Sequence, residues 1–103
     1  MNYLLKFVGF AILLSVCNIT SAQGISEVIC RNHQTTMDVI FHWREIGIPI
    51  QNAKEGFDHE DNYELRWWLE GVVKDVYKDP AAGRKFIESG AFFKKCLEIH
   101  RGY

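Results

Sequence analysis

The sequence predicts an all-α fold: a small helical bundle of three long helices plus one short crossing element, closed by one disulfide. Apolar residues recur at spacings of three and four along three stretches, as they do on one face of a helix. These stretches are separated by residues that typically cap the start of a helix and by Gly and Pro, which typically end one. Two cysteines, Cys30 and Cys96, lie near the two ends of this helical sequence. No stretch has the alternating pattern of a strand, and 103 residues suffice for one domain.

Residues 1–22 have the pattern of a secretory signal peptide. Lys6 is the only charged side chain there, an apolar run follows at 7–16, and the small residue Ala22 closes the segment. The run is too short for a membrane-spanning helix, which needs ~20 apolar residues. We therefore expect cleavage near Ala22, a single helical domain over 23–103, and a location in the periplasm or outside the cell.

Cys17 offers an alternative, because Leu14-Ser15-Val16-Cys17 resembles a degenerate lipoprotein signal. Such signals usually carry Gly, Ala or Ser immediately before the cysteine, and the branched Val16 does not match. We expect Cys17 to leave with the signal peptide, so that neither a lipid anchor nor a membrane span remains.

The charge of the mature chain argues against several classes of partner. Cleavage removes Lys6 alone among the charged residues, so 11 basic and 13 acidic side chains remain and the net charge becomes −2. No basic stripe of the kind that binds nucleic acid is present, which excludes that partner class. We find no Gly-rich phosphate loop and no sequence motif of a hydrolase or metalloprotease. We expect no cofactor and no enzymatic activity, and another protein as the partner.

The two mature cysteines are expected to form a disulfide, because export places them in an oxidising compartment. The loop between them is about 65 residues long, and closing it stabilises the fold by ~4 kcal/mol. The alternative is a zinc site. Cys30, His33, Cys96 and His100 together would make a closed Cys2His2 set. Export favours oxidation over thiolate ligation, so we expect no metal.

The first helix is expected over residues 26–46, with Ser26 as its cap and Gly47 with Pro49 as its stop. Its apolar arc covers more than half of the circumference, which indicates contact with two or more neighbouring elements.

His33 and Arg44 lie inside the apolar arc of this helix, only ~20° apart on the helical wheel. They form either a buried polar pair that faces a ligand or a catalytic carboxylate such as Glu64 or Asp75, or two separate structural groups. We favour the structural interpretation, because buried charges are usually paired rather than catalytic.

The connection 47–58, with a short helical turn over 51–55, has a path that the disulfide constrains. In three long helices joined up, down and up, Cys30 and Cys96 would lie ~30 Å apart. A disulfide tolerates a Cα separation of only ~7 Å. The connection must therefore carry the chain back across the bundle as a short descending element.

The second long helix is expected to open at the acidic cluster 58–61, which matches the positive end of the helix dipole. A cation site there, with His59, is the alternative. Asp79 and Pro80 are expected to cap and begin the last helix, which runs to about Ile99. In it Gly90 would mark a close helix crossing. The apolar face of the second long helix comprises Leu65, Trp68, Leu69, Val72, Val73 and Val76.

Tyr63 and Trp67, with Lys74, lie on the side of the second long helix opposite its apolar face. Aromatic residues with charges around them are typical of an interface hot spot. The alternative is that the first helix or the connection 47–58 covers the two rings, in which case they belong to the core. The pattern leaves the two interpretations open.

Several short elements span most of the mature chain: Cys30, Met37, Arg44-Glu45-Ile46-Gly47-Ile48-Pro49, Val76-Tyr77-Lys78-Asp79-Pro80, Phe93 and Cys96. In this layout the chain resembles small exported, single-disulfide helical proteins of Gram-negative bacteria and their phages, a largely uncharacterised group. A looser similarity in layout is to periplasmic acid-stress chaperones, which are also tiny, helical and closed by one disulfide.

We therefore expect an exported protein-binding module without enzymatic activity. One alternative is an acid-activated chaperone, because strong acid would change the mature charge from −2 to +15 and loosen the bundle. Another is an immunity or inhibitor protein against a toxin or enzyme, which rests on size and compartment alone.

Overall fold

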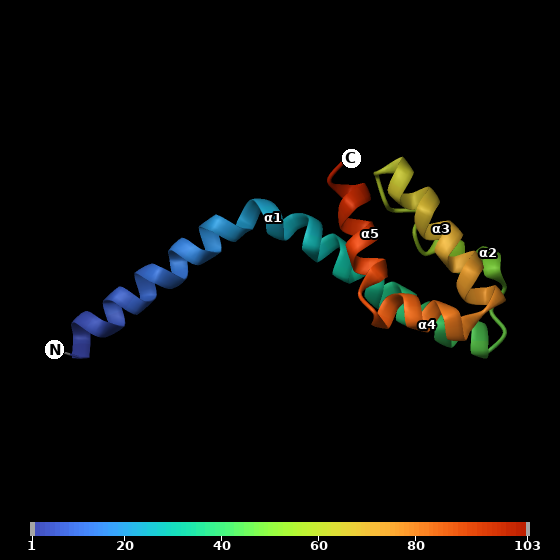
Figure 1. The fold of residues 1–103 in the computed structure, drawn as a ribbon, viewed down its shortest axis with the longest axis horizontal. Coiled ribbons are helices and arrows are strands. Elements are labelled where there is room, and N and C mark those ends of the chain that lie inside the picture. Colours follow the sequence, from blue (N-terminus) through green and yellow to red (C-terminus); the bar gives the residue numbers. More distant parts are fainter. Residues whose placement is uncertain (1, 103) are drawn as a thin grey trace.

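The computed structural model describes the backbone of residues 2–102 and the side chains of residues 24–102. This part of the chain contains five helices and no strand, which confirms the all-α prediction (Figure 1). The expected signal peptide and Cys17 lie outside the described side chains. Over the residues that are described, no helix has both the length and the apolar character needed to cross a bilayer. The helices are α1 (Asn2–Glu45), α2 (Ile50–Glu55), α3 (Tyr63–Lys78), α4 (Pro80–Glu88) and α5 (Ala91–His100).

The helices α1 and α3 run side by side in the same direction (Figure 1). Glu60, just before α3, hydrogen-bonds to His33 in the last third of α1. At the other end of α3, the backbone carbonyl of Tyr77 accepts a hydrogen bond from Arg44 near the end of α1. The segment between α1 and α3 therefore brings the chain back along α1, as the disulfide argument predicted.

Two helices then return toward the disulfide: α4 packs on α3 and meets Phe41 of α1, and α5 packs on α1 beside Cys30. Gly83 of α4 lies at a close helix crossing, because a Cβ there would be 2.9 Å from Val76 Cγ2 and 3.3 Å from Phe41 Cζ. The crossing glycine is thus Gly83, whereas the sequence suggested Gly90.

Gly90 instead divides the expected last helix in two. Its φ of +87° lies in the left-handed region, where residues other than glycine are strained, and α5 starts only after it. The prediction of one long helix from Pro80 to Ile99 is therefore wrong. Gly47, with φ +86°, ends α1 as predicted.

Two expected helix starts also differ from the structure. Ser26 lies inside α1 and does not cap it. The cap of α3 is Asn62, whose side chain accepts a hydrogen bond from the Leu65 amide, and not the acidic cluster 58–61. The predicted cap of α4 is confirmed, because Asp79 accepts a hydrogen bond from the Ala82 amide.

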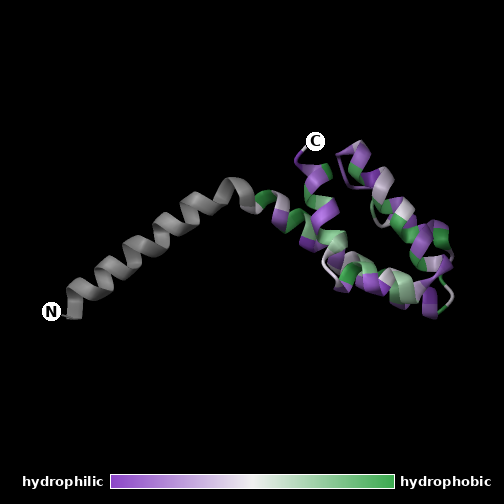
Figure 2. Ribbon diagram, viewed as in Figure 1, coloured by the Kyte–Doolittle hydropathy of each residue, from purple (hydrophilic) through white to green (hydrophobic). Residues whose placement is uncertain are grey.

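The core lies where the apolar sides of all five helices meet. Figure 2 shows hydrophobic and hydrophilic residues mixed along the described part of every helix, as a shared core requires. Its largest fully buried side chains are Phe57, Phe92, Met37, Ile40, Leu65, Leu69, Val73 and Val76. Five residues of the predicted α3 face are buried, and Trp68 is half-buried at its edge.

Candidate functional site

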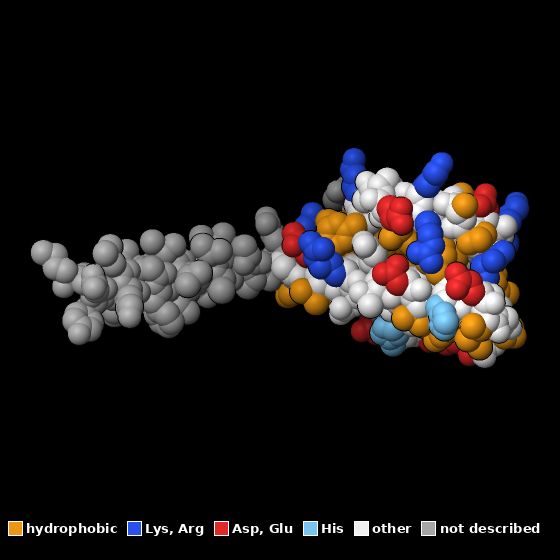
Figure 3. Space-filling model, turned by 90° about the horizontal axis from the view of Figure 1, so that it is seen from below, with side chains coloured by type: hydrophobic (Ala, Val, Ile, Leu, Met, Phe, Trp, Pro, Cys, Tyr) orange, Lys and Arg blue, Asp and Glu red, His pale blue; other side chains and the backbone are white. Residues whose placement is uncertain are grey.

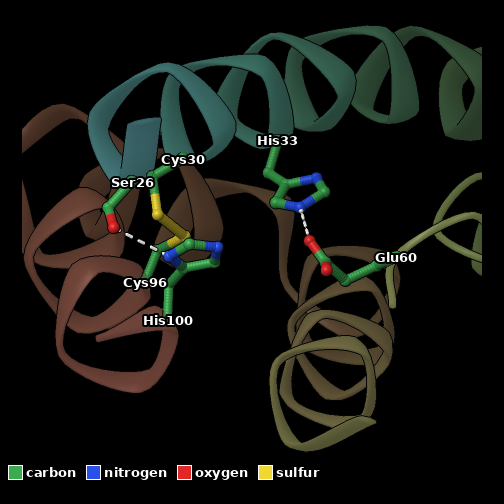
Figure 4. The surroundings of a disulfide bond; sticks show 6 residues. All are labelled: Ser26, Cys30, His33, Glu60, Cys96 and His100. Carbon is green, nitrogen blue, oxygen red and sulfur yellow. Dashed lines mark hydrogen bonds and ion pairs between the residues drawn. A yellow bond between two sulfur atoms is a disulfide. The ribbon is translucent and has the colours of Figure 1, made fainter. Parts of the chain in front are cut away.

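Two regions concentrate the polar and aromatic groups that could act on a ligand. The first, which we call the disulfide end, comprises Ser26, Cys30, His33, Glu60, Cys96 and His100 (Figure 4). Cys30 and Cys96 form a disulfide with a Cα separation of 5.8 Å, and both are fully buried. The predicted pairing is confirmed, and it joins α1 to α5.

His33 and Glu60 form a buried ion pair or hydrogen bond next to the disulfide. The Nε2 atom of His33 lies 2.5 Å from Oε1 of Glu60, and the two side chains are 5% and 10% exposed. The other carboxyl oxygen accepts a hydrogen bond from the Asn62 amide. Burial alone would raise the pKa of Glu60, but these two hydrogen bonds and the imidazoles of His33 and His100 hold its pKa below the usual 4.5.

Arg44 occupies a different place, so His33 and Arg44 do not form one site. Arg44 Nε donates to the backbone carbonyl of Tyr77 at 2.9 Å, and the Tyr77 hydroxyl donates to the carbonyl of Ile48 at 2.8 Å. Burial raises the pKa of Tyr77, although the positive charge of Arg44 opposes that effect. These bonds fix the end of α3 to the end of α1.

The carboxylates that the sequence offered as partners of this pair, Glu64 and Asp75, are both exposed. The partner of His33 is Glu60, which sequence reasoning assigned only to the acidic cluster 58–61. The His33 ring also lies near the His59 ring, with 6.1 Å between their centroids. A catalytic site shared by His33 and Arg44 therefore has no support in the geometry.

The four residues considered as zinc ligands, Cys30, His33, Cys96 and His100, are each bonded to another group of the protein. The two sulfurs are joined to each other, and His100 Nδ1 lies 2.8 Å from the Ser26 hydroxyl. Within residues 24–102, no group of three or more His, Cys, Asp or Glu side chains is arranged to hold a metal ion. The Ser26–His100 contact resembles a nucleophile and base, but a catalytic pair needs a third group to orient the imidazole. No hydrogen bond in the described part of the chain supplies one.

The second region, which we call the α3 face, is an exposed stripe along that helix. It comprises Tyr63, Trp67, Gly71, Lys74 and Lys78, at the spacing of one side of a helix. Tyr63 is 72% exposed and Trp67 is 70% exposed. The alternative that α1 or the connection covers these rings is therefore wrong. Their neighbour Arg66 lies over the Tyr63 ring at 5.7 Å from its centroid.

Two hollows flank the α3 face. One, of about 520 Å³, lies between α2 and α3 and is lined by both apolar and charged groups, among them Trp67, Gly71, Lys74 and Lys54. The other, of about 370 Å³, lies between α3 and α4. Trp68 lines both hollows, and its indole stacks on Phe92 with 5.2 Å between ring centroids.

The charges on one further face of the described part of the chain are mixed. On the face shown in Figure 3, acidic, basic and apolar side chains are interspersed, and no field of one sign gathers there. Sequence reasoning identified Tyr63, Trp67 and Lys74 but missed Gly71. A signal was present, since Gly71 follows Tyr63 and Trp67 at steps of four residues.

No protein-family model, no curated protein and no solved structure matches this chain.

Proposed function

We propose that this chain is an exported, non-enzymatic protein-binding module that acts in the periplasm or outside the cell and docks through the α3 face. The observation that carries the proposal is the exposure of Tyr63 and Trp67, one turn apart on the same helix. Large aromatic side chains are enriched among the few residues that supply most of the binding energy at protein interfaces.

The helix that presents these rings is rigidly held, which favours binding. Leu65, Leu69 and Val73 on its opposite side are fully buried. Asn62 caps its start, and the Arg44 side chain hydrogen-bonds near its end. A partner would therefore meet side chains on a preformed surface and would lose little conformational entropy in ordering it.

A substitution experiment tests this proposal. The exported protein, its Trp67→Ala variant and a Val28→Ala control are each immobilised and exposed to the exported proteins of the source organism. Val28 is a suitable control because it is apolar and 58% exposed but lies on α1. A retained protein is then purified and titrated against all three. We expect Trp67→Ala to weaken binding about 30-fold or more, as a hot-spot residue does, and Val28→Ala to leave it unchanged. Equal binding by all three would contradict the proposal.

An acid-activated chaperone remains the second candidate function, and the His33–Glu60 pair favours it. Because the pKa of Glu60 is held below 4.5, acid must protonate this carboxyl against its native contacts. Loss of the pair would loosen the link between α1 and the start of α3. Helicity and the aggregation of a client protein at about pH 2–3 test this candidate. A protein that keeps its native fold there and protects no client would rule it out.

An immunity or inhibitor protein would be a special case of the first proposal. Its partner would be a toxin or an enzyme, and the titration with the purified partner would include that partner's activity. Inhibition by the exported protein but not by Trp67→Ala would assign this role.

A further inference from the structure

We infer that a second copy of this chain docks on the α3 face, so that two α3 helices cross antiparallel at Gly71. The inference rests on the proposed function of the α3 face as a docking surface, and it names the partner. Three observations on this face carry it: a glycine with open space above it, a self-complementary order of side chains, and a hollow beside the exposed Trp67.

Gly71 has no role in the packing of its own chain. A Cβ at this position would meet nothing within 4 Å, although the residue lies in the middle of α3. Glycine in a helix interior costs about 1 kcal/mol relative to alanine. Gly83 is the contrasting case, because its neighbours leave no room for a Cβ. At Gly71 the missing side chain leaves bare backbone on the surface, where a second helix can approach closely.

The side chains on either side of Gly71 complement each other under a two-fold axis through this residue. Such an axis places each residue before Gly71 opposite the one equally far after it. Glu64 of one copy then faces Lys78 of the other, Lys74 faces the half-buried indole of Trp68, and Trp67 faces Asp75. The first contact is an ion pair and the second is a cation–π contact. A parallel arrangement would instead oppose Lys74 to Lys74 and Lys78 to Lys78.

These charged groups are available for a second copy. Within the described residues, the ion pairs are His33–Glu60 and Lys95–Glu98, so Glu64, Lys74 and Lys78 form no ion pair with any of these residues.

The hollow between α2 and α3 completes the match. It measures about 520 Å³ and is lined by Gly71 and Lys74, directly beside Trp67. A projecting ring and a hollow thus lie on the same small surface. A two-fold symmetric contact requires such self-complementarity, because each copy must supply both parts. In the antiparallel pair, Trp67 of each copy points toward the Gly71–Asp75 side of the other.

The contact is confined to one helix and its two borders, so it belongs to the weak class of interfaces, below about 1,200 Å² of buried surface. We therefore expect reversible dimerisation. The exported protein is studied by sedimentation velocity over roughly 10 μM to 1 mM, the range expected of a small interface. The average mass should rise from monomer toward dimer across this range.

A charge exchange tests the geometry. Lys78→Glu places two carboxylates opposite each other at both ends of the pair, and should weaken dimerisation at least ~10-fold. Combining it with Glu64→Lys restores opposite charges and should return the dissociation constant to within ~3-fold of the original. Both residues are exposed, so circular dichroism and thermal unfolding should be unchanged in all variants.

Each result separates this inference from the proposed function. A wild-type monomer at 1 mM overturns the inference, and so does a dimer that Lys78→Glu does not weaken or that the double variant does not restore. A monomer that still binds another protein through Trp67 leaves the proposed function intact. A dimer that Lys78→Glu weakens and the double variant restores supports the inference, even when no other protein binds the α3 face.

Discussion

The disulfide end and the α3 face both gather polar and aromatic groups, but they differ in where these groups find their partners. At the disulfide end, His33 is 4% exposed and hydrogen-bonds to Glu60 inside the chain. Along the α3 face, Trp67 is 70% exposed, and Lys74 and Lys78 form no ion pair with any described residue. The first region therefore holds the fold together, whereas the exposed groups of the second contribute less to it and are the ones that we propose to bind. Substitutions in the two regions should therefore change different measured quantities.

Loss of the disulfide should have the largest effect on stability. The bond joins residues 66 positions apart, and opening a loop of that length costs about 4 kcal/mol of unfolding free energy. We expect Cys30→Ala combined with Cys96→Ala to lower the free energy of urea unfolding by about this amount. Reductant should destabilise the wild-type protein and leave the double variant unchanged. A wild-type protein that is indifferent to reductant would contradict the prediction.

Glu60→Gln should have the next largest effect, because it leaves His33 buried beside a neutral acceptor. The expected loss is about 1–3 kcal/mol at neutral pH, measured by urea unfolding. The pH dependence should change as well. The pKa of Glu60 is depressed in the folded state, so its stabilisation is complete above 4.5 and is lost as the pH falls through the folded pKa. Below pH 4.5 the wild-type protein should therefore lose stability more steeply than Glu60→Gln. Parallel curves would show that this carboxyl does not contribute.

Alanine substitutions at two glycines should change the stability of the fold in opposite directions. One glycine lies at a buried helix crossing, and the other lies on the exposed α3 face. Gly83→Ala places a methyl group against the buried Val76 and Phe41, and overpacking of about 1–3 kcal/mol exceeds the gain in helix propensity. Gly71→Ala meets open space and should stabilise the monomer by up to about 1 kcal/mol. Thermal unfolding at low protein concentration measures both. If both variants shift in the same direction, the assigned crossing is wrong.

Trp67→Ala should have the smallest effect on the fold. Its ring is 70% exposed, and substitutions at such positions usually change stability by less than about 0.5 kcal/mol. The adjacent Trp68→Ala is the matched control, because that ring stacks on Phe92 and its loss should be clearly destabilising. Loss of binding without loss of stability in Trp67→Ala would separate the two regions. A strongly destabilised Trp67→Ala variant would contradict the distinction.

The sequence predicted those parts of the fold that depend on local pattern. The apolar face of α3, the Asp79 cap and the Gly47 stop follow from spacing and from residue chemistry, and the structure contains all three. The contact between α1 and α5 could be predicted from the disulfide, which was itself expected because an exported chain enters an oxidising compartment. From the disulfide alone, the return path of the connection could also be predicted.

The remaining features depend on tertiary contacts. Glu60 meets His33 because an irregular segment of turns and the short α2 ends beside it, and no local pattern specifies which of several carboxylates arrives there. Gly90 and Gly83 are alike in the sequence, since each interrupts an apolar helical pattern. Only the packing of α4 against Phe41 distinguishes a crossing from a break. The exposure of Tyr63 and Trp67 was likewise undecided until the positions of α1 and α2 were known.

The position of the disulfide has a mechanical consequence. Because the bond joins residue 30 to residue 96, the segment between them is a covalent ring, and the described chain beyond Cys96 is only a short tail. A pulling force applied to residues 24 and 102 would pass through the sulfur–sulfur bond and would not load the core inside the ring. In the same way, one proteolytic cut between residues 30 and 96 would leave both pieces joined. The protein would therefore withstand stretching and nicking better than its small core alone would allow.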